Sequence, residues 1–460
     1  MLGDTVTSPP LPAHAADAMQ AFLAGLEQQH NGAAAAAMAH YQRALALNPA
    51  FPQACNNLAA LLKEQDKLAA GVACLRRAVA LLPDSAALHS NLGNLLWAIG
   101  AYDDAEAAFR RSLELDPVRP ETWHNYGLLQ HGKGELARAV ASFDRALERM
   151  PGDSQIRMDR ALALLAAGDL ARGFAEYRVR FEVHPPTEAV PDIPLWRGEE
   201  IAGRTLLVHP EQGFGDTIQF VRYLPLLAER GVRVQLACPP ALRRLLRNLP
   251  GIAHWVEPGA AIPPADLRVP LLDLPHLLGT TLADIPARVP YLHPPARTGE
   301  RTVARRPDTK LTVGIAWAGN PEHKNDRLRS MELGQLLPLC GLRGVELYSL
   351  QTGPRAADIA RIGAEPLLHD SGGGLRDFAD TAAVIAELDL VVGVDTALVH
   401  LAGALGRPAF VMLAYRPDWR WLSGRDDSPW YPTLRLFRQR KPGGWSDVVR
   451  DVGAALEALS

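Results

Sequence analysis

The stretch WHNYGLLQHGKGELARAVASF, residues 123–143, holds the pattern that decides the fold of the first third of the chain. Its small residue Gly127 and its aromatic residue Phe143 belong to series that recur every 34 residues. A proline series keeps the same period, and proline ends a helix because it cannot donate the next intrahelical hydrogen bond. The pattern predicts five units of two short helices, which bury their apolar faces by stacking into a superhelix with a groove. The series are small residues at 25, 59, 93, 127 and 161, large apolar residues at 41, 75, 109, 143 and 177, and prolines at 49, 83, 117, 151 and 185.

Local motifs agree with this period. The WHNYG sequence at 123–127 and the A-x3-F spacing at 139–143 resemble the tetratricopeptide repeat (TPR). The resemblance implies an α-solenoid over residues 16–187, made of five repeats and preceded by a flexible tail over residues 1–15.

Asparagine recurs at the sixth place of repeats two to four, as Asn57, Asn91 and Asn125. At about 100° per residue this place points away from the helix-packing positions and toward the groove. One interpretation is a row of amides that binds the backbone of an extended acceptor peptide. The other is structural, with each amide bonding to an adjacent repeat. The row resembles the asparagine ladder of the nucleocytoplasmic O-linked N-acetylglucosamine transferase, although Leu23 and Asp159 interrupt it.

Composition narrows the class of protein. A chain of 460 residues with 48% apolar and 22% charged residues is typical of a soluble globular protein with several domains. The formal net charge of −3 argues against a general binder of nucleic acid or of membrane surfaces. The four cysteines show no metal-ligand spacing, the start lacks a secretory signal, and the longest apolar run, 388–413, contains ionisable residues. We therefore expect a cytoplasmic protein with no membrane span.

After residue 188 the period stops, and short apolar runs alternate with helical stretches. Such alternation predicts parallel sheets covered by helices on both faces. A polar, basic break at 296–310 divides this part into two Rossmann-like halves, 188–305 and 306–460. Ligands of this architecture bind beyond the carboxyl ends of the strands, here in a cleft between the halves. The apolar runs are 205–209, 232–238, 311–317, 345–351, 388–394 and 408–413.

The first of three strand-to-helix loops is HPEQGFGDTIQF, residues 209–220. Its glycines permit a tight turn, and Asp216 falls in the first turn of the helix that follows. Asp216 is either a helix cap or a general base that takes the proton of an attacking hydroxyl. His209 and Glu211 are alternative bases in the same loop.

The second loop, AWAGNPEHKNDRLRS at 316–330, carries cations beyond a strand of the second half. Lys324 and Arg329 are candidates to bind a diphosphate through charge-assisted hydrogen bonds. A solvated loop explains the same charges.

The third loop, GVDTALVHLAGALG at 393–406, puts polar residues between a buried strand and a buried helix. If Asp395 caps this helix, the N–H groups of Thr396, Ala397 and Leu398, the helix dipole and the Thr396 hydroxyl form an anion site. His400, one turn further on, could face the same ligand. The alternative is a helix cap followed by a core histidine.

Together, in order and spacing over residues 200–440, these loops resemble the bacterial heptosyltransferases, which have the two-domain GT-B fold. The segment DWRWLSGRDDSPWYPTLRLFRQ at 418–439 is similar to the tail of bacterial proteins that fuse such a domain to TPRs, flagellin glycosyltransferases among them. The resemblance implies Asp216 as the base, and Ala397 stands where glycine is usual. Donor binding is then expected of Lys324, Arg329, Gln351, Asp395, Thr396, Ala397 and His400.

We therefore expect an inverting, metal-independent glycosyltransferase. It would move a sugar from a nucleotide sugar to Ser or Thr of a protein held in the groove by the three asparagines, with flagellin as one candidate acceptor. No D-x-D motif at a strand end calls for a metal, so the nucleotide sugar is a substrate and no cofactor is expected. The alternatives are a TPR adaptor with an inactive GT-B domain, a glycan-directed heptosyltransferase-like enzyme, and a sugar-nucleotide epimerase.

Overall fold

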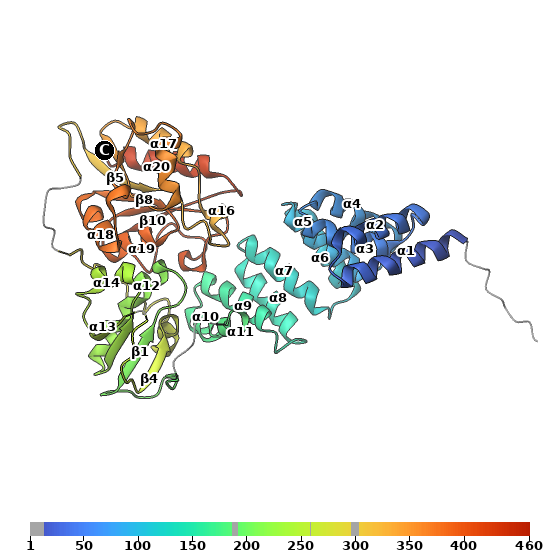
Figure 1. The fold of residues 1–460 in the computed structure, drawn as a ribbon, viewed down its shortest axis with the longest axis horizontal. Coiled ribbons are helices and arrows are strands. Elements are labelled where there is room, and N and C mark those ends of the chain that lie inside the picture. The colour runs from blue at the N-terminus through green and yellow to red at the C-terminus, as the bar shows by residue number, and fades with distance from the viewer. Residues whose placement is uncertain (1–12, 186–191, 258, 296–302) are drawn as a thin grey trace, which may run out of the picture. The chain divides into compact units, whose positions relative to one another are not determined.

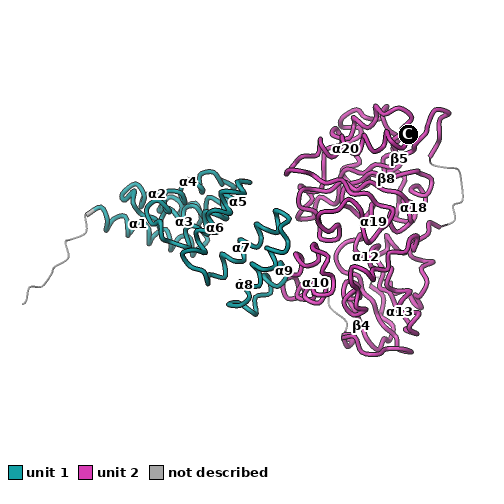
Figure 2. Tube along the Cα trace, turned by 180° about the vertical axis from the view of Figure 1, so that it is seen from behind, with its two compact units in different colours: residues 1–160 teal, residues 161–460 magenta. Residues whose placement is uncertain are grey.

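The computed structural model describes residues 13–185, 192–257, 259–295 and 303–460 (Figure 1). Most of the tail expected over residues 1–15 lies outside these ranges, and the first helix already begins at Ala13. Contacts divide the chain into two compact units, Met1–Arg160 and Ala161–Ser460 (Figure 2). This division falls within the fifth repeat, so the end of that repeat groups with the α/β part of the chain, whereas the sequence placed the boundary after residue 187.

The first unit is a series of helix pairs. The helices of each pair pack on one another, and successive pairs stack, as the α-solenoid prediction requires (Figure 1). The helices are α1 (Ala13–His30), α2 (Ala34–Leu47), α3 (Pro52–Glu64), α4 (Leu68–Leu81), α5 (Ala86–Ala98), α6 (Tyr102–Leu115), α7 (Pro120–Gly132), α8 (Leu136–Leu147) and α9 (Ser154–Ala167), the last of which crosses into the second unit.

The period of the small and large residues has a steric cause. A β-carbon added at Gly127 of α7 would lie 2.6 Å from the Phe143 ring of α8, and one at Gly93 would lie 2.7 Å from the Phe109 ring. Both rings are fully buried. Each first helix therefore needs a small residue where the large side chain of its partner helix packs.

The second unit contains two parallel sheets, and their strands confirm the α/β prediction. The first sheet has the order β3-β2-β1-β4 and the second has the order β10-β9-β8-β5-β6-β7. Every pairing between these strands is parallel. The strands are β1 (Thr205–His209), β2 (Arg233–Ala237), β3 (Ile252–Val256), β4 (Leu267–Pro270), β5 (Leu311–Ala316), β6 (Val345–Ser349), β7 (His369–Asp370), β8 (Leu390–Val394), β9 (Ala409–Leu413) and β10 (Leu434–Arg438).

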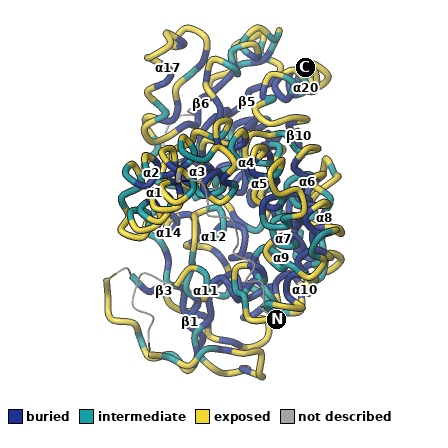
Figure 3. The backbone as a smooth tube through the Cα atoms, turned by 90° about the vertical axis from the view of Figure 1, so that its right-hand side faces the viewer, coloured by how far each residue is buried: buried dark blue, intermediate teal, exposed yellow. Residues whose placement is uncertain are grey.

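Helices cover both sheets, which explains why central strands such as β5 and β8 are buried at every position (Figure 3). This is the pair of Rossmann-like halves expected of a GT-B fold. The halves meet through helices, since α12 contacts α19 and α14 contacts α18 (Figure 1). Besides α9, the α-helices in the described part of this unit are α10 (Leu170–Tyr177), α11 (Arg180–Val183), α12 (Phe214–Phe220), α13 (Leu224–Glu229), α14 (Pro240–Leu246), α15 (Leu274–Leu277), α16 (Asp326–Arg329), α17 (Asp358–Arg361), α18 (Phe378–Glu387), α19 (Ala397–Ala404) and α20 (Trp445–Glu457).

The end of the fifth repeat packs on both halves. The ring of Phe174 in α10 meets Phe220 of the first half at 6.3 Å, and it meets Trp419 and Trp430 of the second half at 5.4 and 6.4 Å. All three contacts are edge-to-face, the geometry that aromatic pairs favour. Helix α10 is therefore part of the core that joins the two halves.

Candidate active site

Two helix starts, one from each half, meet at the carboxyl ends of β1 and β8. Helix α12 begins after Gly213, and α19 begins after Thr396. A β-carbon at Gly215 would lie 3.0 Å from the His400 ring and 3.5 Å from the Cα of Ala397. The glycine therefore allows the two helices to touch, and the cleft expected between the halves is closed at this corner.

Asp216 lies at this corner and bonds in two directions. Its Oδ2 accepts a hydrogen bond of 2.9 Å from the backbone N–H of Gly213, which is the N-cap of α12, so Asp216 caps the helix from its third position and is not itself the N-cap. Its Oδ1 forms an ion pair with Arg420 of the other half. The side chain is 16% exposed. Asp216 is thus a cap and also the point where the first half binds a cation of the second.

Arg420 is the main residue that the sequence did not single out. It lies in a short 3-10 turn, Trp419–Trp421, and Nη1 donates to Asp418 at 2.7 Å. The guanidinium lies 4.4 Å from the centre of the Trp419 ring, and the residue is 7% exposed. The Trp-Arg-Trp sequence could suggest a buried cation, but nothing local indicates a partner in a loop so distant along the chain.

The carboxylate of Asp395 occupies the end of β8, beside this arginine. Burial and the nearby Asp418 carboxylate raise the pKa of Asp395 to about 6, and the charges of Arg329 and Arg420 oppose that rise. The structure corrects the capping role expected for this residue, because Thr396 is the N-cap of α19 and its side chain forms no capping bond.

Besides the indole N–H groups of Trp419 and Trp421, three buried donor atoms at the corner have no hydrogen-bond partner among the residues that the structure describes. They are Arg329 Nε, the Thr396 hydroxyl and Arg420 Nε. Arg329 and Arg420 act electrostatically on Asp395, which adjoins Thr396, so all three donors belong to one neighbourhood. Unpaired buried donors are costly, and a group of them is a natural place for an anionic ligand.

His400 is engaged by the protein itself. Its Nδ1 lies 3.0 Å from the Tyr431 hydroxyl, its Nε2 lies 3.9 Å from Asp395 Oδ1, and its ring stacks on Trp421. Burial and the Arg420 charge lower its pKa to about 3, so the ring is neutral. This matches the core-histidine alternative, and no imidazolium charge is offered to a ligand in this arrangement.

The loop at 316–330 brings only part of its charge to the corner. Lys324 is exposed and forms no hydrogen bond or ion pair with residues in the described ranges. Arg329, 21% exposed, lies 3.6 Å from Asp326. The amide of Gln351 is used entirely by the backbone, accepting from Trp317 and Ala318 and donating twice. Gln351 therefore positions the loop after β5 and has no group left for the donor, contrary to expectation.

The two alternative bases in this loop, Glu211 and His209, have different surroundings. Arg180 of α11 binds both oxygens of Glu211, at 2.8 and 2.6 Å. Burial and the Arg268 charge lower the pKa of His209 to about 4. Glu211 is thus held by an arginine, as Asp216 is, whereas Nε2 of His209 is buried and has no hydrogen-bond partner among the described residues.

In the first unit the asparagine row forms a bonded network over part of its length. Asn57 donates to the Tyr41 hydroxyl at 3.4 Å and accepts from Asn56 at 3.2 Å. Asn91 reaches back to the preceding repeat and donates to Asn56 at 2.7 Å. Asn125 is half-buried. The structural alternative therefore describes the bonds of Asn57 and Asn91 in this structure.

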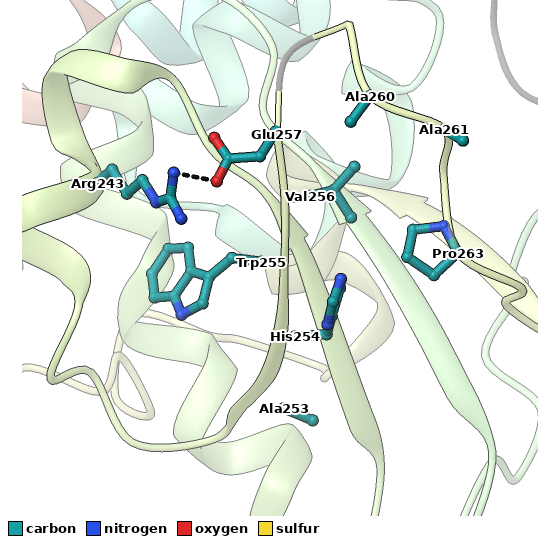
Figure 4. Close-up of a pocket in the computed structure, with 9 residues that line it drawn as sticks. All are labelled: Arg243, Ala253, His254, Trp255, Val256, Glu257, Ala260, Ala261 and Pro263. Atoms are coloured by element: carbon teal, nitrogen blue, oxygen red, sulfur yellow. Dashed lines mark ion pairs between the residues drawn. The ribbon is translucent and has the colours of Figure 1, made fainter.

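A shallow pocket of about 470 Å³ lies elsewhere, on the outer strand β3 of the first sheet (Figure 4). His254 and Trp255 line it, and an ion pair between Arg243 and Glu257 borders it. Its lining includes none of the corner residues.

Within the described ranges, two kinds of feature are absent. No group of three or more His, Cys, Asp or Glu side chains there is arranged to hold a metal ion. None of the helices in those ranges combines the length and apolar character needed to cross a bilayer.

Comparison with known proteins agrees with both parts of this architecture. Residues 374–421, which include the start of α19 and Arg420, match the model of glycosyltransferase family 9 (heptosyltransferase). Residues 56–120 and 127–179 match the tetratricopeptide repeat. The chain therefore combines repeats similar to the tetratricopeptide repeat with a segment similar to glycosyltransferases of the heptosyltransferase type.

Among characterised proteins, the chain is similar to Protein FlbA of Caulobacter vibrioides, with 29% identity over 294 residues, 57% of this chain and 48% of FlbA. The chain thus spans about half the length of the curated relative it matches. Among solved structures it is similar to the MamA protein, at 18% identity over 38% of this chain and 98% of that one, with a TM-score of 0.33. It is also similar to a thermophilic TPR protein of Thermus thermophilus, at 22% identity over 37% of this chain and 93% of that one, with a TM-score of 0.33.

Proposed function

We propose that the second unit is an inverting glycosyltransferase that binds the phosphate of a nucleotide sugar at the corner of α12 and α19. The observation that carries this proposal is a group of three buried donors without a hydrogen bond to any described residue: the Thr396 hydroxyl, Arg420 Nε and Arg329 Nε, the last of which lies 3.6 Å from Asp326. Each such donor costs roughly 1–3 kcal/mol while it stays unpaired. A phosphate supplies several strong acceptor oxygens, so one ligand would satisfy the group.

In the proposed reaction, the acceptor hydroxyl attacks the anomeric carbon, and the bond from that carbon to the phosphate oxygen breaks. Asp216 takes the hydroxyl proton, and the nucleotide leaves with the bonding electrons. Arg329, Lys324 and the start of α19 stabilise the leaving phosphate, a role that a divalent metal serves in other transferases. We therefore propose that the reaction needs neither metal nor cofactor.

The acceptor in this proposal is Ser or Thr of a protein bound by the repeats, and flagellin is one candidate. TPR arrays bind partners in their grooves. Asn125 is the member of the row best placed to bind a peptide, because Asn57 and Asn91 would first have to break the bonds described above. We place the reaction in the cytoplasm, a reducing compartment that suits the four free cysteines.

A second candidate function is a TPR adaptor whose transferase domain is inactive. The closed corner favours it, since Gly215 lies against His400, which is 5% exposed. A donor would have to separate α12 from α19 before it could bind. An active enzyme has to open at this point, and an adaptor does not.

Co-expression with candidate acceptors and intact-mass analysis separates these functions. We expect the mass of the acceptor to increase by one sugar with the wild type and not to increase with Asp216→Asn. Thr396→Ala should weaken binding of the sugar donor. EDTA should leave the transfer intact. Transfer by Asp216→Asn at the wild-type rate, or strong EDTA inhibition, would contradict the mechanism.

A further inference from the structure

The ion pair between Arg420 and Asp216 is the feature that the proposed reaction does not use. It joins two segments that lie far apart along the chain, one in each half. Arg420 is 7% exposed and also bonds Asp418 at 2.7 Å, so one guanidinium serves two carboxylates. A buried pair of this kind adds little stability over an apolar contact, because both charges lose their hydration. Its presence at the corner needs another explanation.

The pair also limits what Asp216 can do. One oxygen of Asp216 binds the Gly213 N–H and the other binds Arg420. Each oxygen of Asp216 therefore already accepts a hydrogen bond from the protein, and an attacking hydroxyl would have to compete for it with the Gly213 N–H or with Arg420. The proposed base is therefore restrained in the closed structure.

Arg420 is itself incompletely bonded. Its Nε is buried and has no partner among the described residues. Within those same residues, the Thr396 hydroxyl also has no hydrogen-bond partner, and Arg329 Nε has none closer than Asp326 Oδ1, its ion-pair partner at 3.6 Å. A planar guanidinium binds phosphate through two parallel hydrogen bonds, which a single oxygen of Asp216 does not match.

We propose that Arg420 is a phosphate-binding residue that exchanges Asp216 for the phosphate of the donor, and that this exchange releases Asp216 to act as the base. The inference rests on the proposed function. After the exchange, Asp216 keeps its bond to Gly213 at the start of α12, so the carboxylate is not left without a partner. Donor binding and base activation are then one event, and the base is restrained while the site is empty.

The two members of the pair give opposite predictions for binding of inorganic pyrophosphate, measured by calorimetry on the full chain. Arg420→Gln removes the phosphate ligand and weakens binding about ten- to hundredfold. Asp216→Asn removes the competitor of the phosphate and tightens binding relative to the wild type. The double variant binds as weakly as Arg420→Gln alone. Arg425→Gln is the matched control, because Arg425 pairs with Asp427 in the same segment, and it leaves binding unchanged.

The direction in which Asp216→Asn changes the affinity for pyrophosphate decides between this proposal and a purely structural ion pair. If the ion pair were purely structural, changing either residue would weaken the binding of pyrophosphate to the protein. Weaker or unchanged binding by Asp216→Asn therefore overturns the proposal. Unchanged binding by Arg420→Gln overturns it too. Thermal unfolding shows whether Arg420→Gln is folded, and if it is not, the Asp216→Asn result still stands. Sugar transfer by a wild type that does not bind pyrophosphate would refute the role of Arg420 and leave the proposed function intact.

Discussion

The ion pairs of Arg180 test how the end of the fifth repeat is held to the α/β part of the second unit. It comes from α11, is 3% exposed, and donates to Glu211 in the loop after β1 and to Asp273 in the 3-10 turn that follows the neighbouring strand β4. The distances are 2.8 and 2.6 Å to the oxygens of Glu211 and 2.7 Å to Asp273. Asp273 is 1% exposed, so it depends on its partners for compensation of its charge.

The change Arg180→Ala leaves both carboxylates without this cation. Removing one partner of a buried ion pair costs about 3–5 kcal/mol, since the remaining charge stays buried. Arg178 still lies 3.2 Å from Asp273, which places the expected loss near the lower end, about 3 kcal/mol. Urea unfolding of the second unit measures this loss through the shift of the midpoint at constant slope.

The control is Arg172→Ala in the preceding helix α10. Arg172 is 57% exposed and pairs with Asp169, itself 38% exposed, so its removal should cost less than about 1 kcal/mol. If Arg180→Ala costs no more than Arg172→Ala, the fifth repeat is not held to the loop of Asp216 in the way described.

Three other predictions concern single side chains. Gly127→Ala should destabilise the repeats by about 1–3 kcal/mol, although alanine favours helices, because its β-carbon would lie 2.6 Å from Phe143; Gly152→Ala, with open space around it, should not. Burial raises the pKa of Glu106, but hydrogen bonds from Lys133 and Tyr126 outweigh this and lower the pKa from 4.5 to about 2. The ionised Glu106 therefore stabilises the fold at pH values above 4.5, and this stabilisation is lost as the pH falls toward 2. Acid titration of Glu106→Gln should lack this component of the unfolding free energy. The pKa of Asp395 is raised from 3.8 to about 6, so the protonated side chain stabilises the fold at pH values below 3.8, and this stabilisation is lost as the pH rises through 6. Asp395→Asn should therefore become more stable than the wild type as the pH rises across that interval.

Much of the fold could be predicted because its causes are local or periodic. The 34-residue spacing of residues such as Gly127 and Phe143 predicted the paired, stacked helices, and the structure shows that these two residues touch. The apolar runs at 205–209 and 408–413 correspond to β1 and β9, because a central parallel strand must be apolar on both faces. Strands β3 and β4 escaped detection, because β3 is partly exposed at the sheet edge and β4 ends in Pro270.

The site was harder to predict because its contacts are non-local. The loop containing Asp216 and the segment around Thr396 were identified, since helix starts after buried strands carry recognisable residues. Arg420 was missed, because only the folded chain brings it to Asp216. The sequence predicted that Gln351 binds the sugar donor, but both the oxygen and the nitrogen of its side-chain amide bond to the backbone after β5.

The central claim is that the corner of α12 and α19 binds the phosphate of the donor. A crystal structure of the full chain with a nucleoside diphosphate tests this most directly. We expect phosphate oxygens within hydrogen-bonding distance of the Thr396 hydroxyl and the Arg329 guanidinium. A diphosphate bound instead beside His254 and Trp255 on strand β3, with the corner still closed, would contradict it.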